Sequence, residues 1–293
     1  MHPDTFTLDR WAMLDAAGRE AASLALAGAL PAAFAFSGIH ACALAAQDHE
    51  VAFFDYAGSP FALIPGGDID LGYDCERPFV PTERQRASWR ATQDEYGCGE
   101  LEEYLAYYLT PVRTVSLAPF LLEVGAVEQG LTPISIDLVL SGGARGQRGG
   151  TLYSGIPVAH SAVVDLLAGD GFRLPTSDEW EHACAAGART LFRWGDDCPA
   201  DHYPSGDADG LHFDFELHRR PNAFGLRIGL DPYDWEMVAE PSVMRGGDGG
   251  GVISAGAGYM AGWLTLATAF VDPEYREWPG YGTAIRRAYT LPR

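Results

Sequence analysis

The sequence is short of basic residues. Its 293 residues contain 20 arginines and no lysine, against 40 aspartates and glutamates, so the formal net charge is −20 at pH 7. A chain with this charge repels the phosphates of nucleic acids and the surface of anionic membranes, and we expect it to bind neither. The excess of acid is typical of a surface that keeps a protein in solution.

Cysteines are also few, and their arrangement is unfavourable for a disulfide scaffold. There are five, at positions 42, 75, 98, 184 and 198, with no C-x-x-C spacing. An odd number without that spacing argues against a disulfide framework or a zinc knuckle and favours a reducing compartment. We therefore expect a cytoplasmic protein; a disulfide between Cys75 and Cys98 stays open as an alternative.

The apolar run from Ala21 to Ala46 lacks the features of a signal peptide or a membrane span. Acidic residues precede it, where a signal peptide carries positive charge, and Pro31, Gly38 and His40 interrupt it. A packed helix followed by a strand is therefore predicted.

The overall pattern predicts a mixed fold with many loops. Apolar residues make up 47% of the chain, enough for a large core, while 35 glycines and 19 prolines disfavour an all-helical structure. Periodicity predicts one helix over residues 8–30, strands at 33–36, 51–56 and 61–64, and one or two helices within 74–110.

The most informative segment is residues 171–181, which read GFRLPTSDEWE. Thr176 and Glu179 have the spacing of a capping box, in which each side chain accepts a hydrogen bond from the other residue's backbone N–H. A helix is therefore predicted to begin near Ser177, with Trp180 opening its apolar face.

This RLPT-x-x-EWE run, with FRWGD at residues 192–196, resembles the sulfatase-modifying-factor family, whose best-known member is the formylglycine-generating enzyme. Residues 61–72 (FALIPGGDIDLG) resemble the opening hairpin of that family. The resemblance implies an α+β, C-type-lectin-like fold with short strands and many loops. It assigns residues 51–293 to the family domain and leaves residues 1–50 as a helical and strand extension packed on that domain.

The resemblance also implies a calcium site in an acidic loop. Carboxylates at alternate positions beside glycine suit this ion, which prefers hard oxygen ligands. In the family pattern the ligands here would be the side chain of Asp201, the carbonyl of His202, the side chain of Asp209 and the carbonyl of Leu211. A solvated acidic loop without calcium is the alternative.

A second calcium site of the family would use Glu236. The asparagine ligand of the family pattern is missing, because Ile228 or Gly229 stands in its place. Asp231 or Asp234 could substitute for it, but we expect this second site to be lost.

The family's oxidase chemistry is not expected. Arg245-Gly246-Gly247 matches a family motif after which two cysteines bind copper in the oxidase branch, but no cysteine follows Cys198 here. Soft thiolates are what select Cu(I), so copper is not expected. Another branch holds iron with histidines and an H-x-x-x-H-x-E motif, and the eight histidines here lack that spacing. We assign no catalytic residue.

Aromatic and acidic residues remain in the C-terminal region, where Trp235, Asp248, Tyr259 and Trp263 form a candidate pocket. Aromatic faces beside a carboxylate suit a cationic or sugar-like ligand; core packing is the alternative interpretation. The sequence thus favours a pseudoenzyme that acts as a binding or accessory domain, with an unidentified small-molecule or protein ligand and an unknown oligomeric state. The alternative is a repurposed metal- or oxygen-dependent enzyme that uses a site without cysteine.

Overall fold

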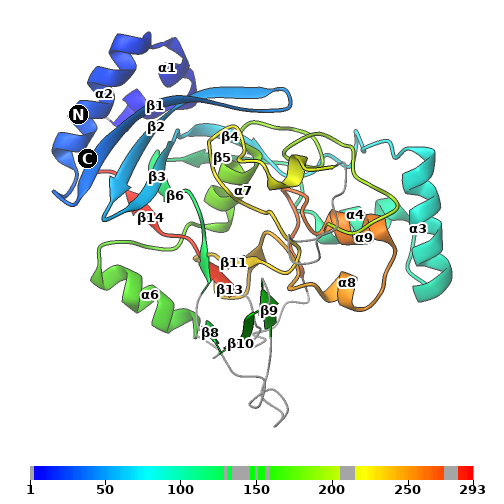
Figure 1. The fold of residues 1–293 in the computed structure, drawn as a ribbon. Helices are drawn as coiled ribbons and strands as arrows, with labels where there is room; N and C mark the ends of the chain where they lie inside the picture. Colours follow the sequence, from blue (N-terminus) through cyan, green and yellow to red (C-terminus); the bar gives the residue numbers. More distant parts are fainter. Residues whose placement is uncertain are drawn as a thin grey trace.

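The chain forms a mixed α+β structure, drawn as a ribbon in Figure 1. This computed structural model describes residues 3–128, 131–133, 146–148, 151–155, 159–204, 215–273 and 283–292. The helices are η1 (Pro3–Phe6), α1 (Leu8–Met13), α2 (Ala16–Ala29), α3 (Glu83–Tyr96), α4 (Leu101–Tyr108), α6 (His160–Gly169), α7 (Ser177–Ala185), η3 (Leu217–Arg219), α8 (Gly251–Ser254) and α9 (Tyr259–Leu264). Within the described ranges, no helix combines the length and the apolar character that a membrane crossing needs.

The strands form one larger sheet and three small ones. The larger sheet has the order β1-β2-β3-β6-β14, and its neighbouring strands are antiparallel. Its strands are β1 (Phe34–Leu44), β2 (Gln47–Tyr56), β3 (Ser59–Ile64), β6 (Phe120–Glu123) and β14 (Ala288–Thr290). The small sheets have the orders β12-β11-β13-β7, β4-β5 and β8-β10-β9. Their strands are β4 (Gly67–Leu71), β5 (Arg113–Leu117), β7 (Val127–Glu128), β8 (Leu131–Pro133), β9 (Gly146–Arg148), β10 (Thr151–Gly155), β11 (Trp235–Met237), β12 (Met244–Arg245) and β13 (Thr283–Ile285).

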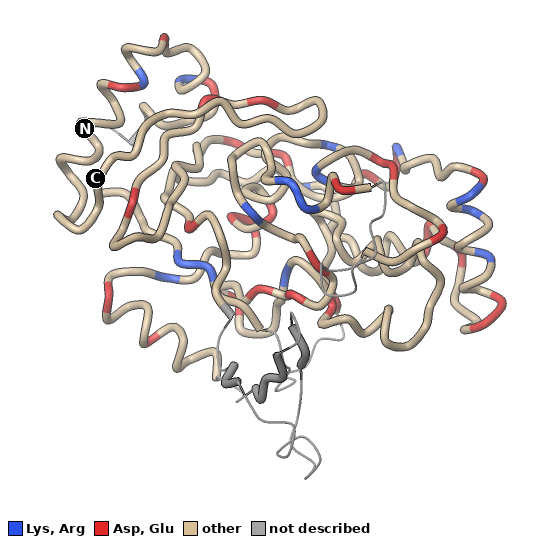
Figure 2. Tube along the Cα trace, in the orientation of Figure 1, with Lys and Arg blue, Asp and Glu red and all other residues tan. Residues whose placement is uncertain are grey.

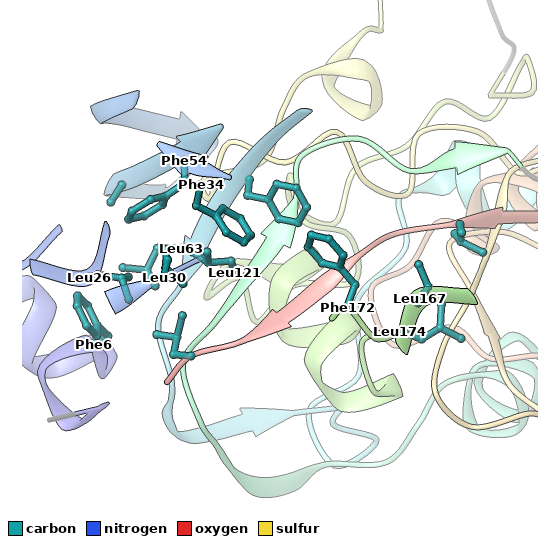
Figure 3. Packing of buried hydrophobic residues seen from close by; sticks show 14 of the residues in the cluster. Phe6, Leu26, Leu30, Phe34, Phe54, Leu63, Leu121, Leu167, Phe172 and Leu174 are labelled. Carbon is teal, nitrogen blue, oxygen red and sulfur yellow. The ribbon is translucent and has the colours of Figure 1, made fainter. Parts of the chain in front are cut away.

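The larger sheet packs on the N-terminal helices through buried aromatic residues (Figure 3). The ring centroid of Phe34 lies 5.5 Å from that of Phe61 and 6.1 Å from that of Phe172. Phe6 and Leu26, from the N-terminal segment, belong to the same cluster. A second cluster joins α3, α4 and α9, and a third packs α7 on the larger sheet.

The N-terminal extension contains two helices where one was predicted. The helix expected over residues 8–30 is broken at Leu14 and Asp15, so the prediction of a single helix is wrong. Asp15 adopts an extended backbone, and its carboxylate accepts a hydrogen bond from the N–H of Gly18, which starts α2. The division expected between residues 50 and 51 falls inside β2, which hydrogen-bonds to β1 on one side and to β3 on the other.

The opening hairpin expected from residues 61–72 is not formed. β3 pairs with β2 and β6, whereas β4 pairs with β5 in a different sheet. Gly66 lets the chain pass from β3 to β4 close to the end of β5, because a Cβ atom at that position would lie 2.3 Å from the carbonyl oxygen of Leu117. The predicted helices within 74–110 are confirmed as α3 and α4. Cys75 and Cys98 are both free thiols, so the alternative of a disulfide is not realised.

Charged side chains are unevenly distributed along the chain. No Asp, Glu, Lys or Arg occurs from residue 21 to residue 47, which covers most of α2 and the whole of β1. This stretch is tan in Figure 2, while acidic residues recur along most of the remaining trace. Strand β1, one of the two edges of the larger sheet, is therefore uncharged in a chain whose net charge is −20.

Candidate functional site

Helix α7 begins where the sequence predicted, at Ser177. The hydroxyl of Thr176 accepts a hydrogen bond from the N–H of Glu179 at 3.1 Å, and the Glu179 carboxylate accepts one from the N–H of Thr176 at 2.8 Å. The predicted capping box is thus confirmed. The guanidinium of Arg173 donates two hydrogen bonds, of 2.6 and 2.7 Å, to the same carboxylate. The RLPT-x-x-E part of the motif therefore fixes the start of one helix.

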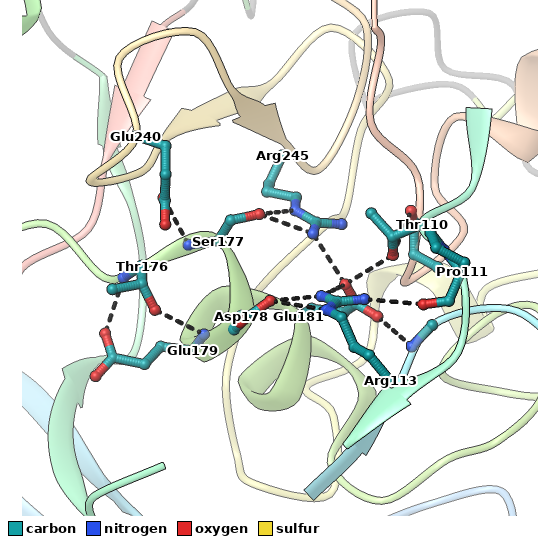
Figure 4. A network of polar contacts seen from close by, with 12 residues as sticks. Thr110, Pro111, Arg113, Thr176, Ser177, Asp178, Glu179, Glu181, Glu240 and Arg245 are labelled. Carbon is teal, nitrogen blue, oxygen red and sulfur yellow. Dashed lines mark hydrogen bonds and ion pairs between the residues drawn. The ribbon is translucent and has the colours of Figure 1, made fainter. Parts of the chain in front are cut away.

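The next glutamate of the motif, Glu181, lies at the centre of a buried polar network (Figure 4). Its Oε2 accepts hydrogen bonds from Arg113 at 2.8 Å, from Arg245 at 2.9 Å and from the hydroxyl of Thr110 at 3.0 Å. Its Oε1 accepts one from the N–H of Gly72 at 2.7 Å. Both carboxylate oxygens are therefore occupied, and α7 is joined to β5, to β12 and to the end of β4.

Arg245, from the Arg-Gly-Gly motif, is fully buried. Its guanidinium donates to the hydroxyl of Ser177 and to the carbonyl of Phe270 as well as to Glu181. Burial lowers the pKa of Arg245, and the neighbouring Glu181 carboxylate opposes that shift. The motif arginine is thus held by the first turn of α7 and does not face an open site.

Glu236 lies in a second buried ion pair. Arg286 donates to both of its oxygens, at 2.8 and 2.9 Å, and the indole N–H of Trp180 donates to Oε2 at 2.9 Å. Glu236 also borders a cavity of about 280 Å³ that Asp234 and Arg227 help to line. Because a guanidinium already takes both carboxylate oxygens, this geometry favours a structural role for Glu236 over that of a calcium ligand.

Half of the expected first calcium site lies within the described residues. Asp201 is exposed, and its carboxylate lies 2.8 Å from Nδ1 of His202. The carbonyl of His202 accepts a hydrogen bond of 2.8 Å from the indole of Trp263. The other two expected ligands, Asp209 and Leu211, lie outside the described residues. Among those described, no group of three or more His, Cys, Asp or Glu residues is placed to hold a metal ion.

The four residues of the candidate pocket lie in different surroundings. Trp235 is buried in the cluster of the larger sheet, whereas Trp263 is fully buried in the cluster around α9. Tyr259 is 40% exposed and packs its ring 4.9 Å from that of Tyr203. Asp248 belongs to the turn before α8, and a Cβ atom on the next residue would lie 3.1 Å from the Trp235 ring. Of the four residues, Trp235 and Asp248 therefore come close, since the Trp235 ring lies against the turn that contains Asp248.

Asp248 has an incompletely satisfied carboxylate. Its Oδ2 accepts a hydrogen bond of 2.8 Å from the N–H of Val252, while its Oδ1 is buried and has no hydrogen-bond partner among the described residues. Burial raises the pKa of Asp248, the nearby backbone N–H groups of Val252, Gly250 and Gly251 partly oppose that shift, and the neighbouring Asp272 raises the pKa further. A buried oxygen without a partner costs free energy, and a ligand with a donor would supply the missing interaction.

Tyr104 and Tyr108, from α4, also lie near Asp248. Burial raises the pKa of Tyr104 far above its usual value, and the nearby Tyr108, Asp248 and Asp272 raise it further. The rings of Tyr104 and Tyr108 lie 4.4 Å apart. The signal available in the sequence was the i, i+4 spacing of these tyrosines, which also fits the inner face of a helix.

Aromatic rings and two histidines surround Trp263. His218 lies 4.9 Å and His202 6.1 Å from the Trp263 ring, and Phe215 lies 5.2 Å from it. The histidines therefore come together in space although they are 16 positions apart in sequence. Each histidine ring is nearly perpendicular to the Trp263 ring, which indicates aromatic packing around Trp263.

The five cysteines are free thiols, and two of them, Cys184 and Cys198, are buried. Burial raises the pKa of Cys184 to about 11 and that of Cys198 to about 12. Burial also raises the pKa of Cys42 and of Cys98, and Cys75 is exposed. A thiol whose pKa is raised is a weak nucleophile and a weak copper ligand at neutral pH, since both roles need the thiolate.

Comparison with known proteins adds no relative: neither a protein-family model nor a curated protein matches this sequence at a significant level.

Proposed function

We propose that the protein is a ligand-binding or accessory protein built on the C-type-lectin-like scaffold of the sulfatase-modifying-factor family, without formylglycine-generating activity. One observation carries this proposal: the motif residues on which the resemblance depends converge in space. Glu181 pairs with Arg245, and Trp180 joins Glu236, which pairs with Arg286. Motifs far apart in sequence are thus joined by buried ion pairs and hydrogen bonds, which is the expected role of residues that hold a scaffold together.

The residues after the Arg-Gly-Gly motif explain why oxidase chemistry is not part of the proposal. The turn that follows consists of Asp248 and three glycines, and its carboxylate binds the backbone N–H of Val252. Cys184 and Cys198 are buried, and burial raises the pKa of both thiols. No cysteine follows Cys198 in the sequence. Thiolate ligands for Cu(I) are therefore absent from the part of the sequence that would supply them.

The ligand class that suits the Asp248 turn is cationic. Oδ1 of Asp248 is buried without a partner, Trp235 lies against the adjacent glycine, and Tyr104 is close enough for Asp248 to raise its pKa. Aromatic faces beside a carboxylate attract organic cations through the ring quadrupole and the negative charge together. A neutral sugar would use the same rings but would depend less on the charge.

A binding titration separates these two ligand classes. We expect choline to change the tryptophan fluorescence of the protein saturably, and Asp248→Asn to abolish that change. Methyl glucoside should show no such dependence on Asp248. The matched control is Asp9→Asn, on the exposed surface of α1, which should bind choline as the wild type does. Equal choline binding by Asp248→Asn and wild type, or none by either, would contradict a cation site at this turn.

A second candidate function, a repurposed enzyme, is favoured by the same carboxyl group. A half-buried Asp248 with a raised pKa has the property expected of a general acid or base. An activity that depends on Asp248, and whose pH profile moves in Asp248→Asn, would favour the enzyme over the binding protein.

The remaining parts of the proposal concern calcium and location. We propose that one calcium ion is bound through Asp201 and His202 together with Asp209 and Leu211, and that the protein is cytoplasmic. The exposed Asp201 carboxylate and the odd number of free cysteines support these two statements respectively.

A further inference from the structure

Strand β1 is one of the two edges of the larger sheet. It pairs with β2 on one side, and the described residues place no strand on the other. A β-bulge between Phe36 and Gly38 interrupts the ladder, so the regular part of the edge runs from Gly38 to Leu44. Ala41 and Ala43 are exposed and Ile39 is half-buried. An edge of this length is a template for a further strand.

The register of the hairpin identifies which backbone groups face outward. Leu44 pairs with Gln47 across a two-residue turn, so these two residues form a hydrogen-bonded pair. Hydrogen-bonded pairs alternate along an antiparallel ladder, which directs His40 and Cys42 toward β2 as well. The N–H and C=O groups of Ile39, Ala41 and Ala43 therefore point away from the sheet, and the described part of the chain provides no partner for them.

This edge lacks the features that usually prevent strand pairing. Protected edges carry charged residues, above all lysine, or proline. β1 has the sequence FAFSGIHACAL, without a charge or a proline, and lysine is absent from the whole chain. The bulge protects only the beginning of the strand.

Charge decides which partner fits this edge. The chain has a net charge of −20, but residues 21–47 contain no charged side chain. A basic partner would have no acidic residue of β1 to bind, whereas a second copy meets an identical uncharged edge and no like charge across the contact. A two-fold axis makes the edge complementary to itself.

We propose that two copies of this chain associate by antiparallel pairing of their β1 edges about a two-fold axis at Ala41. Ala41 then pairs with Ala41 of the partner subunit, and Ile39 pairs with Ala43 of the partner subunit. These pairs form about six hydrogen bonds across the two-fold axis. In this register the Ala45–Ala46 turn of one copy lies beside residues 36 and 37 of the other, next to a cavity of about 390 Å³ that Phe36 and Ile39 help to line.

Such a dimer has an unusual dependence on salt. The interface is uncharged, but the two bodies it joins are both strongly acidic, so their long-range repulsion opposes association. Salt screens this repulsion, since the Debye length falls from about 10 Å at 0.1 M to about 3 Å at 1 M. Dimerisation is therefore stronger at high salt, the opposite of an interface held by ion pairs.

Sedimentation equilibrium of the full chain tests the proposal, over protein concentrations from about 1 to about 100 µM, the range expected for a small interface. The wild type is expected to dimerise, with a dissociation constant that falls as sodium chloride is raised. Ala41→Lys places two like charges opposite each other and should raise the dissociation constant at least about tenfold. The matched control Ala87→Lys, on the exposed face of α3, should dimerise as the wild type does.

Ala41→Pro and hydrogen exchange give independent readouts. Proline at position 41 removes an N–H that faces outward, so it should prevent dimerisation while leaving the β1–β2 ladder intact. In the wild type, the amides of Ile39, Ala41 and Ala43 should become protected at high protein concentration, while those of His40 and Cys42 are protected at all concentrations. A wild type that is monomeric throughout, or a dimer that survives both substitutions at position 41, would overturn the proposal.

Discussion

Replacing Glu181 by alanine should destabilise the fold severely, because it leaves Arg245 buried without its carboxylate. The Arg245 side chain is fully buried, and Glu181 is the acidic group to which it donates a hydrogen bond. Removing one partner of a buried ion pair typically costs about 3–5 kcal/mol of unfolding free energy. We expect a loss of that size, which is a large part of the roughly 5–15 kcal/mol that stabilises an ordinary domain.

Two variants show whether the loss comes from the unpaired charge. Glu181→Met combined with Arg245→Met removes both buried charges and should recover a substantial part of the stability, because Arg113 still pairs with Asp178 at 2.6 Å. The matched control is Glu83→Ala, which breaks an exposed ion pair with Arg90 and should leave stability unchanged.

Urea unfolding followed by tryptophan fluorescence measures these differences, provided that the dependence of free energy on urea is the same in all variants. A loss below about 1 kcal/mol in Glu181→Ala would refute the reasoning, since it would mean that Arg245 finds water or another partner at little cost. Equal stability of the single and double variants would show that the two charges are not coupled.

Further predictions concern pH, the helix cap and calcium. Burial lowers the pKa of His182 to about 4. As pH falls, the unfolded chain therefore binds the proton first, and the unfolding free energy should decline by about 3 kcal/mol between pH 6.5 and 4. Urea titrations at several pH values should show a flatter decline for His182→Gln, and an unchanged slope would contradict a neutral, buried His182. Thr176→Ala should lower the unfolding free energy by about 1 kcal/mol, because it removes one half of the capping box; calorimetry that detects no change would argue against the cap. Calcium at a hundredfold above its dissociation constant would add about 2.7 kcal/mol to the unfolding free energy, so chelation should lower the melting temperature by several degrees. Asp201→Ala should lose that response, and equal melting temperatures of the wild type with calcium and with chelator would exclude the site.

The local parts of the structure were the most predictable from sequence. The start of α7 depends on Thr176 and Glu179, three positions apart, so the spacing alone was sufficient. The break before α2 also has a local cause, the capping of Gly18 by Asp15, but the continuous apolar pattern of residues 8–30 concealed it. A capping residue inside an apolar periodicity is compatible with both one helix and two.

The long-range parts were not predictable in the same way. β4 pairs with β5 although residues 61–72 read as a local hairpin, because partner choice between strands is settled by tertiary packing. Glu181 and Arg245 are 64 positions apart, and Glu236 and Arg286 are 50 apart. Aromatic composition likewise did not reveal that Trp235 and Trp263 belong to different hydrophobic clusters.

The measurement that tests the proposed function most directly is mass spectrometry of a sulfatase-type cysteine peptide incubated with the protein, oxygen and a reductant, with copper and without it. The proposal predicts that the peptide keeps its cysteine at the rate of a control without protein, because no thiol follows the Arg-Gly-Gly motif and Cys184 and Cys198 have raised pKa values. Formylglycine that accumulates in proportion to the protein, and disappears when the protein is heat-denatured, would contradict it.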